Sequence, residues 1–396
     1  MTWPIQKLGN LAEKIDYGLT TSSTQESVGP KFLRITDIQN DRVDWNAVPF
    51  CLCSDSDKVK YGLRDGDIVF ARTGATTGKS YLVTGCPPNV VFASYLIRVR
   101  PKMNILDPLF LSHYFRTPSY WRQIAGSSSG TAQPGVNGSK LSELKIPIPP
   151  LSEQKRIAAI LDKADGLRRK RQEAIRLSEE FLRSVFLEMF GDPVANPKGW
   201  TVRSLNSLSE VQGGLQVQQS RREHDLQVPY LRVANIYRDR LVLDEIKYIG
   251  VTESELRRTS LSAGDVLIVE GHGNPDEIGR SAVWDGSIDL CVHQNHLIRV
   301  RVDSSVADPI YVSAFLNSSG GRRQMFAHGK TTSGLNTINL TNVKETEIPI
   351  PPIDIQNRYS KLVRKIMETG KRNLRFDSHI RIYTSSVVSA LFNDSQ

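Results

Sequence analysis

Two long segments of the chain place apolar residues at alternating steps of three and four, which is the spacing of a heptad seam. They cover residues 152–190 and 354–392, and each follows a Pro-Pro pair. Prolines stop a preceding strand, and Ser152 and Asp354 are good helix N-caps. The seam positions are Ile157, Ile160, Ala164, Leu167, Leu182, Val185, Tyr359, Leu362, Ile366, Phe376, Ile380, Tyr383 and Val387. We expect two helices, each roughly 58 Å long at about 1.5 Å per residue, that pair with each other.

The regions before these helices have a different pattern. Short β-rich runs alternate with Gly, Pro, Asn and Ser, and a few helical pieces lie among them, which is typical of α+β globular domains. We therefore expect an α+β domain at 1–150, a first spacer helix at 151–190, a second α+β domain at 191–352 and a second spacer helix at 353–396.

The two halves repeat one another. FLRITDIQNDRV at 32–43 matches YLRVANIYRDRL at 230–241, and LRDGDIVFAR at 63–72 matches LSAGDVLIVE at 261–270, both 198 residues later. LIRVR occurs at 96–100 and again at 297–301, and KIPIPP at 145–150 returns as EIPIPP at 347–352. A repeat of this length indicates two copies of one structural unit, related by an approximate two-fold axis if they pack on each other. The helices would then be antiparallel, with one domain at each end of a coiled-coil rod.

The composition narrows the class of partner. The formal net charge of +9 favours a polyanion, although composition does not distinguish DNA from RNA or an acidic protein. No run of 18 apolar residues and no signal-like start occur, so we expect a cytoplasmic protein. The four cysteines form no C-x-x-C pair, which argues against a disulfide framework or a cysteine zinc site.

The loop ARTGATTGKS at 71–80 resembles a P-loop but is one residue too short. The sequence after it reads as strand, turn and strand, whereas a P-loop precedes a helix. In the second copy VEGHGNPDEIGRS replaces it, three residues longer and with Arg280 in place of Lys79. We expect a loop between strands that varies with the target, and no bound nucleotide.

Other catalytic and metal signatures are weak. Cys291, His293 and His296 match no common zinc spacing, so we expect strand histidines. We find no adenine-methyltransferase turn, no G-x-G-x-x-G after a strand and no nuclease signature in both halves. The chain is predicted not to be an enzyme and to use no cofactor or metal of its own. Any S-adenosylmethionine, ATP or magnesium would belong to its partners.

A basic protein with two related heads on a stiff spacer fits two half-sites on one DNA duplex. Because the heads differ in sequence, the double-stranded target should be split and asymmetric. The candidate DNA contacts lie in three loops of each head, at 19–25, 71–80 and 127–133 in the first and at 215–222, 269–281 and 328–334 in the second. The residues singled out are Arg72, Thr76, Thr77, Lys79, Thr131 and Gln133 in the first head, and Gln216, Gln218, Gln219, Arg221, Arg222, His272, Asn274, Asp276, Arg280, Lys330 and Thr331 in the second. The same compositions also occur in solvated surface loops that bind nothing. The basic run at 168–171 faces either DNA, an acidic partner or solvent.

These residues resemble a known family. The segments IPIPPLSEQKRIAAILDKAD, GDIVFARTGATTGKS and SSSGTAQPGVNGSKLSELKIPIPP, in a tandem arrangement, look like the DNA specificity subunit of type I restriction-modification systems. The resemblance implies two target-recognition domains joined by two antiparallel helices, which dock two methyltransferase (modification) subunits, with restriction subunits in the larger complex. The second copy departs from the pattern at Ile355, where the first has Glu153, and at Gly370.

Two other functions remain open on the residues alone. A scaffold whose two heads bind proteins would have the same repeat and rod. A nucleotide- or metal-dependent nuclease would need the isolated chain to bind nucleotide or metal, and the short loop speaks against it.

Overall fold

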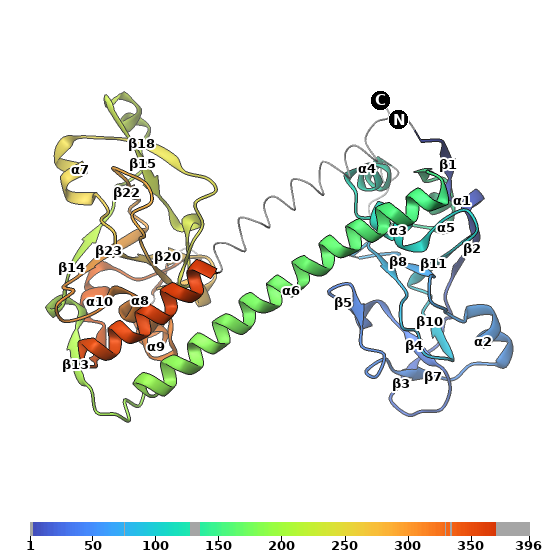
Figure 1. Cartoon of the computed structure of the whole chain (residues 1–396), viewed down its shortest axis with the longest axis horizontal. Coiled ribbons are helices and arrows are strands. Elements are labelled where there is room, and N and C mark those ends of the chain that lie inside the picture. Colours follow the sequence, from blue (N-terminus) through green and yellow to red (C-terminus); the bar gives the residue numbers. More distant parts are fainter. Residues whose placement is uncertain (1–2, 75, 127–134, 329, 333–334, 370–396) are drawn as a thin grey trace. The chain divides into compact units, whose positions relative to one another are not determined.

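The computed structural model describes residues 3–74, 76–126, 135–328, 330–332 and 335–369. The chain divides into two compact units, the first containing the chain up to Arg171 and the second beginning at Gln172. Figure 1 shows the elements of both units, and helix α6 (Leu151–Phe190) contributes residues to each. The long first helix predicted from the sequence is confirmed.

The first unit is built on a four-stranded antiparallel sheet, β2-β11-β8-β9, beside a second sheet, β10-β4-β7-β3, and the small pairs β1-β12 and β5-β6. Its elements are β1 (Ile5–Lys7), α1 (Leu8–Leu11), β2 (Ala12–Tyr17), β3 (Ser23–Thr24), β4 (Lys31–Leu33), η1 (Ile35–Asp37), β5 (Ile38–Gln39), β6 (Arg42–Val43), β7 (Phe50–Cys51), α2 (Asp55–Tyr61), β8 (Ile68–Ala71), β9 (Ser80–Leu82), β10 (Val90–Phe92), β11 (Leu96–Pro101), α3 (Pro108–Tyr114), α4 (Pro118–Gly126), α5 (Gly138–Ser142), β12 (Lys145–Pro147) and the first part of α6.

Alternation along β8 explains why this sheet lies in the interior. Successive strand residues point to opposite faces, and all four residues of β8 are buried. Ile68 and Phe70 join the core that contains residues of α3, α5 and α6, whereas Val69 joins the core under the second sheet. The sheet therefore separates two hydrophobic cores, and a continuous apolar run is what a strand covered on both faces requires.

The second unit repeats this plan with sheets β14-β23-β19-β21 and β18-β15-β22, the pairs β13-β26 and β16-β17, and a short sheet β20-β25-β24. Its elements are β13 (Thr201–Ser204), η2 (Leu205–Ser207), β14 (Ser209–Gly213), η3 (Gln219–Glu223), β15 (Leu226–Leu231), η4 (Val233–Asn235), β16 (Ile236–Tyr237), β17 (Arg240–Leu241), β18 (Lys247–Val251), α7 (Glu253–Thr259), β19 (Val266–Val269), β20 (Gly271–His272), η5 (Pro275–Glu277), β21 (Ser281–Val283), β22 (Val292–His293), β23 (Leu297–Val302), α8 (Pro309–Asn317), α9 (Ser319–His328), β24 (Lys330–Thr332), β25 (Leu335–Thr337), α10 (Leu340–Glu345) and β26 (Glu347–Ile350). The predicted α+β class and internal repeat are confirmed.

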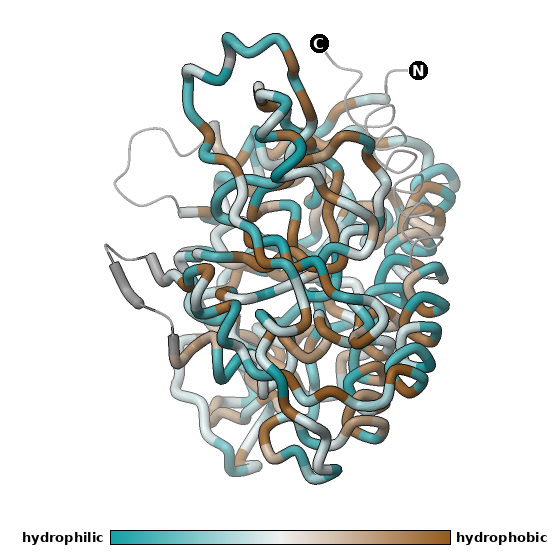
Figure 2. Tube along the Cα trace, turned by 90° about the vertical axis from the view of Figure 1, so that its left-hand side faces the viewer, coloured by the Kyte–Doolittle hydropathy of each residue, from teal (hydrophilic) through white to brown (hydrophobic). Residues whose placement is uncertain are grey.

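Both long helices begin at the predicted domain boundaries, but Ser152 and Asp354 are not their N-caps, so that expectation is wrong. Helix α6 starts at Leu151 and the C-terminal helix, 353–369, starts at residue 353, so Ser152 and Asp354 lie inside the first turns. The predicted remainder of the second helix, with Phe376, Ile380, Tyr383 and Val387, lies outside the described residues. Figure 2 shows apolar and polar residues recurring in alternation along helical turns.

A buried glutamine fixes each helix start. Gln154 accepts a hydrogen bond from the Asp107 backbone N–H at 2.9 Å and donates to the carbonyls of Ile105 and Pro149, both at 2.9 Å. Gln356 accepts from the Asp308 N–H at 2.9 Å and donates to two equivalent carbonyls. In both halves a Gln follows the IPIPP motif by four residues, and these hydrogen bonds give it a role: it joins the start of the helix to the preceding domain.

The seam residues have several environments. Ile157 is buried in the core of the first unit, whereas Ile160 and Leu167 are each 38% exposed. Ala164 is half-buried. Farther along α6, Leu182 and Val185 pack against the core of the second unit, as does Tyr359. The C-terminal helix also contributes Leu362 and Ile366, both half-buried.

Aromatic rings join the end of α6 to the start of the C-terminal helix. Within the second unit, Phe186 and Phe190 meet the ring of Tyr359 at centroid distances of 5.7 and 5.4 Å. The last turns of one helix thus lie against the first turns of the other, which is the contact an antiparallel pair makes at this end. Among the described residues, no helix is both long enough and apolar enough to cross a bilayer.

Candidate nucleic-acid interface

The loop at 72–79 joins two antiparallel strands, β8 and β9, as predicted. Helix α4 anchors the loop, because the hydroxyl of Tyr120 on this helix donates a hydrogen bond to the Gly78 carbonyl at 2.5 Å. Thr77 closes the loop by donating its hydroxyl to the Gly74 carbonyl at 2.7 Å. Thr76 is half-buried, and Arg72 and Lys79 are exposed. The two ends of the loop therefore present cations, and hydrogen bonds hold its backbone at Gly74 and Gly78.

Hydrogen bonds join Arg72 to the turn before β11 and to the segment just before α5. Arg72 donates its backbone N–H to the Tyr95 carbonyl at 3.1 Å and accepts from the Val136 N–H at 3.1 Å. Its guanidinium carbon lies 5.0 Å from the centre of the Tyr17 ring. We call Tyr17, Arg72, Tyr95 and Val136 the first loop junction.

Tyr17 and Tyr95 connect the loop at 19–25 and the turn between β10 and β11 to this junction. Tyr17 ends β2 just before the loop at 19–25, and its hydroxyl accepts from the Gly138 N–H at 3.0 Å. Tyr95 lies in the turn between β10 and β11, beside Ser94, whose N–H donates to Leu19 at 3.0 Å. The exposed fractions of Tyr17 and Tyr95 are 39% and 66%. An exposed Arg beside an exposed aromatic ring is a suitable nucleic-acid surface.

The second unit has the same backbone junction. Glu270 donates its N–H to the His296 carbonyl at 3.0 Å and accepts from the Ile338 N–H at 2.9 Å. Leu215, at the start of the loop at 215–222, accepts from the Asn295 N–H at 2.8 Å. Gly213 pairs with Ile298 of β23 as Tyr17 pairs with Ile97 of β11. We call Gly213, Glu270, His296 and Ile338 the second loop junction. The scaffold is repeated while every junction side chain differs.

The second junction has the opposite charge from the first. The Glu270 carboxylate lies 3.7 Å from His296 Nδ1, and burial raises the pKa of Glu270 above its ordinary value while His296 opposes that rise. A carboxylate here replaces the guanidinium of the first unit. The two units thus offer different hydrogen-bonding chemistry at one structural position.

The hairpin loop of the second unit is stabilised by its own polar residues. His272 Nδ1 accepts from the Asn274 N–H at 3.0 Å, and Asn274 caps η5 by accepting from the Asp276 N–H at 3.0 Å. Asp276 also pairs with Arg322 at 3.1 Å. Asn274 and Asp276 are exposed, and His272 is half-buried.

Arg280 is the buried member of that loop. Only 5% of its surface is exposed, its guanidinium donates to Glu277 at 2.7 Å and to the Val233 carbonyl at 3.0 Å, and it lies over the ring of Tyr237. Glu277 has its pKa lowered mainly by the hydrogen bond from Arg280. Unlike Lys79, its counterpart in the repeat, Arg280 holds the loop from inside.

The loop at 215–222 exposes its amides but not its first arginine. Gln216, Gln218 and Gln219 are exposed. Arg221 forms a bidentate pair with Glu255 at 2.8 and 3.0 Å, and that hydrogen bonding lowers the pKa of Glu255 to about 2. The Arg222 backbone lies in η3.

The last candidate loop lies partly outside the described chain. Thr131 and Gln133 fall outside the described residues. Lys330 and Thr331 lie on β24, paired with Thr337 and Asn336 of β25. Since β25 also pairs with β20, this hairpin joins the strand that follows Glu270.

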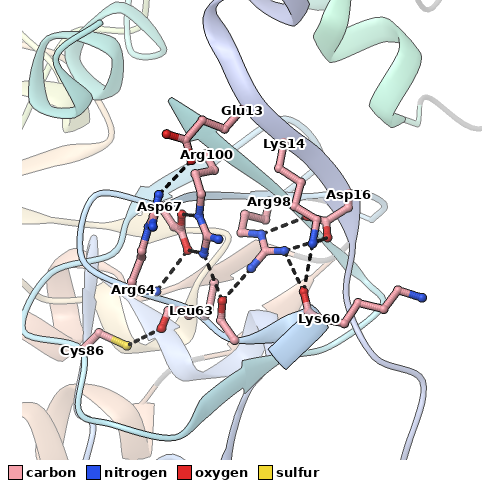
Figure 3. Close-up of polar contacts among 11 residues, drawn as sticks. Glu13, Lys14, Asp16, Lys60, Leu63, Arg64, Asp67, Cys86, Arg98 and Arg100 are labelled. Atoms are coloured by element: carbon pink, nitrogen blue, oxygen red, sulfur yellow. Dashed lines mark hydrogen bonds and ion pairs between the residues drawn. The ribbon is translucent and has the colours of Figure 1, made fainter. Parts of the chain in front are cut away.

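Two arginines of β11 form ion pairs with aspartates of neighbouring segments (Figure 3). Arg98 is fully buried and donates to Asp16 of β2 at 2.9 and 2.7 Å, and Arg100 donates to the buried Asp67 at 2.7 Å. Arg299 and Arg301 make the corresponding pairs with Glu210 and Asp265. The repeated LIRVR pentapeptide was the sequence signal for this framework.

The histidines and cysteines behave as ordinary fold residues. His293 is a buried strand residue, and burial lowers its pKa to about 4. His296 instead lies in a turn, so its predicted strand position is wrong: the turn lets β22 and β23 belong to different sheets. All four cysteines are free thiols. Across the described ranges, no cluster of three metal-binding side chains occurs.

The basic run of α6 has partners on its own helix. Arg168 lies 3.6 Å from Asp165, and Arg169 lies 4.0 Å from Asp162. Asp165 is also paired with Arg116 at 2.7 Å. At least half of the run is therefore partly neutralised within the first unit.

Comparison with known proteins identifies the family. The model of the type I restriction modification DNA specificity domain matches the chain twice, over residues 2–177 and 197–372. The chain belongs to this family, and the sequence resemblance is confirmed.

Individual relatives cover most of the chain. The EcoKI specificity subunit of Escherichia coli K12, from a type I restriction enzyme, is 26% identical over 358 residues, 84% of this chain and 74% of that protein. The putative MjaX specificity subunit of Methanocaldococcus jannaschii is 24% identical over 392 residues, 92% and 86% of the two chains. The crystal structure of the S subunit of a type I restriction-modification system from M. genitalium has a similar fold, with a TM-score of 0.62, 14% identity, and coverage of 100% of this chain and 97% of that one.

Proposed function

We propose that the chain is the DNA-recognition subunit of a type I restriction-modification complex. Each α+β unit reads one half of a split, asymmetric site in double-stranded DNA. The observation that carries this proposal is the loop junction, where the two copies keep the same backbone hydrogen bonds but place Arg72 in one and Glu270 in the other. A repeated frame with exchanged polar side chains is what two related readers of different bases need.

Charge and polar groups have separate tasks in this function. The net charge of +9 supports contact with phosphates, which gives affinity without sequence preference. Exposed Lys79, Gln216, Gln218, Gln219 and Asn274 are candidates for phosphate or base-edge contacts. The paired Arg221 and buried Arg280 would serve the loops that carry these side chains.

The remaining parts of the complex are proposed to act through the helices. Residues 1–150 and 191–352 would be the recognition domains, and 151–190 and 353–396 would set the half-site spacing and dock two modification subunits. Restriction subunits would join the larger assembly. The chemistry, with its S-adenosylmethionine, ATP and magnesium, belongs to those partners, and this chain supplies recognition.

The test is to co-express the chain with the modification subunits of its system and to map methylated adenines across a genome. A single split motif is expected, and exchange of residues 1–150 for those of a related subunit should change one half only. Scattered methylation, or a change in both halves, would contradict the proposal. Salt-insensitive DNA binding together with capture of protein clients by the heads would favour the scaffold.

A further inference from the structure

Arg72 and Glu270 occupy the same position in the two units. In the first sheet Ile97 pairs with Phe70, two residues before Arg72, and in the second Ile298 pairs with Ile268, two residues before Glu270. The backbone N–H of each then donates to the turn residue before β11 or β23, Tyr95 or His296. This equivalence comes from strand register and does not depend on the unequal loop lengths.

The Glu270 carboxylate differs from the structural carboxylates around it. Asp265 and Glu277 are each bound by an arginine at 2.7 or 2.8 Å, and the Arg221–Glu255 pair is bidentate. Within the described chain, the ionisable side chain that lies nearest to the Glu270 carboxylate as an ion-pair partner is His296, whose Nδ1 is 3.7 Å from a carboxylate oxygen. The Glu270 side chain is 27% exposed, so it is partly withdrawn from water but still open to a ligand.

A carboxylate in this place selects its ligand by chemistry. It repels phosphate oxygens and can only accept hydrogen bonds while ionised. In the major groove, the exocyclic amino group of cytosine is the donor that Glu pairs with, whereas Arg pairs with O6 and N7 of guanine. A base without a suitable donor would leave a partly desolvated carboxylate unpaired, which is costly.

We propose that residues 72 and 270 are the equivalent base-discriminating positions of the two units, with Arg72 selecting guanine in one half-site and Glu270 selecting cytosine in the other. The inference rests on the proposed function and adds the residue pair and the bases. His296 is a positioning residue that holds the Glu270 carboxylate, and Tyr17 does the same for the Arg72 guanidinium.

The experiment uses the full chain in complex with its modification subunits and selects duplexes from a randomised pool. The variants are Arg72→Gln, Glu270→Gln and the control Glu253→Gln, whose carboxylate is 85% exposed on α7. Gln pairs with adenine. Glu270→Gln should therefore shift one position of the second half from cytosine towards adenine, and Arg72→Gln should shift one position of the first half from guanine towards adenine. The expected change in preference is about 5- to 150-fold, which is roughly 1–3 kcal/mol.

The outcomes separate this inference from the proposed function. If the wild-type complex selects no split motif, the proposed function fails. If it selects one and Glu270→Gln leaves every position unchanged, as the control should, the inference alone is overturned. Loss of both half-sites by Glu270→Gln also overturns it, because a base contact in one unit leaves the other half readable. His296→Phe should weaken the cytosine preference without creating one for adenine, and an unchanged preference would remove His296 from the proposal.

Discussion

The guanidinium of Arg98 donates two hydrogen bonds to the carboxylate of Asp16, through Nε at 2.9 Å and one Nη at 2.7 Å. Arg98 is fully buried, and Asp16 is 20% exposed. Asp16→Asn would leave a buried guanidinium without its counter-charge, which costs about 3 kcal/mol or more. The loss should appear as a lower free energy of opening for the amides of β2 and β11, measured by hydrogen exchange.

The repeat supplies a matched control for that change. Arg299 donates to Glu210 at 2.5 Å, but the Glu210 side chain is 60% exposed. Arg299 is itself buried, with 2% of its side chain exposed, so the two sites differ in the exposure of the carboxylate. Because Glu210 keeps most of its hydration in the folded state, Glu210→Gln should lose less stability than Asp16→Asn. Equal losses in the two units would show that burial does not decide the strength of these pairs.

His293 makes the stability of the second unit depend on pH. Burial lowers the pKa of the folded His293 to about 4, whereas the unfolded side chain has a pKa of about 6.5. Between these values the unfolded state binds the extra proton, so folding loses stability as the pH falls through this window, by about 1.4 kcal/mol per unit and about 3 kcal/mol in all.

The test compares His293→Phe with the wild type in denaturant unfolding between pH 7 and pH 4. Phe92 stands at the same strand position of the first unit, so the substitution imports a residue the fold already accommodates. Its stability should fall less steeply with acid, and the difference isolates His293 from carboxylates that titrate in both proteins. Parallel pH profiles would contradict the assignment.

Much of the fold followed from repeated patterns. The IPIPP motif predicted where both helices start, because two consecutive prolines remove two backbone donors and end the strand before them. The match of FLRI with YLRV and the repeated LIRVR predicted two related units, and the matching strand orders confirm them. The heptad spacing predicted helices, but spacing reports that one face is buried without identifying what buries it. Ile157 accordingly packs into a domain core.

The site was less predictable because an arginine in a loop can either point to solvent, where a ligand can reach it, or pair with a carboxylate of the protein. Arg221 and Arg280 have the same composition signal as Arg72, yet their partners Glu255 and Glu277 come from elsewhere in the fold or from the same loop. Glu270 lies at the start of the variable segment VEGHGNPDEIGRS but was not among the predicted contacts, and neither were Tyr95 and His296. In an alignment of the two halves on GDIV and GDVL, Arg72 and Glu270 occupy the same position. This difference was the sequence signal for the pair.

Gly78 holds the first hairpin loop in a conformation that other residues adopt at a cost. Its φ is +81°, and an added Cβ would lie 3.2 Å from Cζ3 of Trp121. Gly78→Ala should lose about 2 kcal/mol from backbone strain and contact with α4. Gly85, with φ +61° and open space around it, is the control, and Gly85→Ala should lose about 1 kcal/mol. Equal shifts in thermal unfolding would mean that the Trp121 contact contributes nothing.

Lys79 is expected to act on DNA through charge. Its ammonium is exposed at the end of the hairpin loop, where a phosphate contact would release about one counterion. Lys79→Ala should weaken binding to the split site and reduce the slope of log affinity against log salt by about 0.9, without altering ATP use by the complex. Lys58→Ala is the control, since its ammonium is paired with Asp55 at 2.8 Å on α2. If the salt slope is unchanged in Lys79→Ala, or is reduced equally in Lys58→Ala, Lys79 makes no phosphate contact. If the slope is unchanged but the base preference changes, Lys79 contacts a base instead.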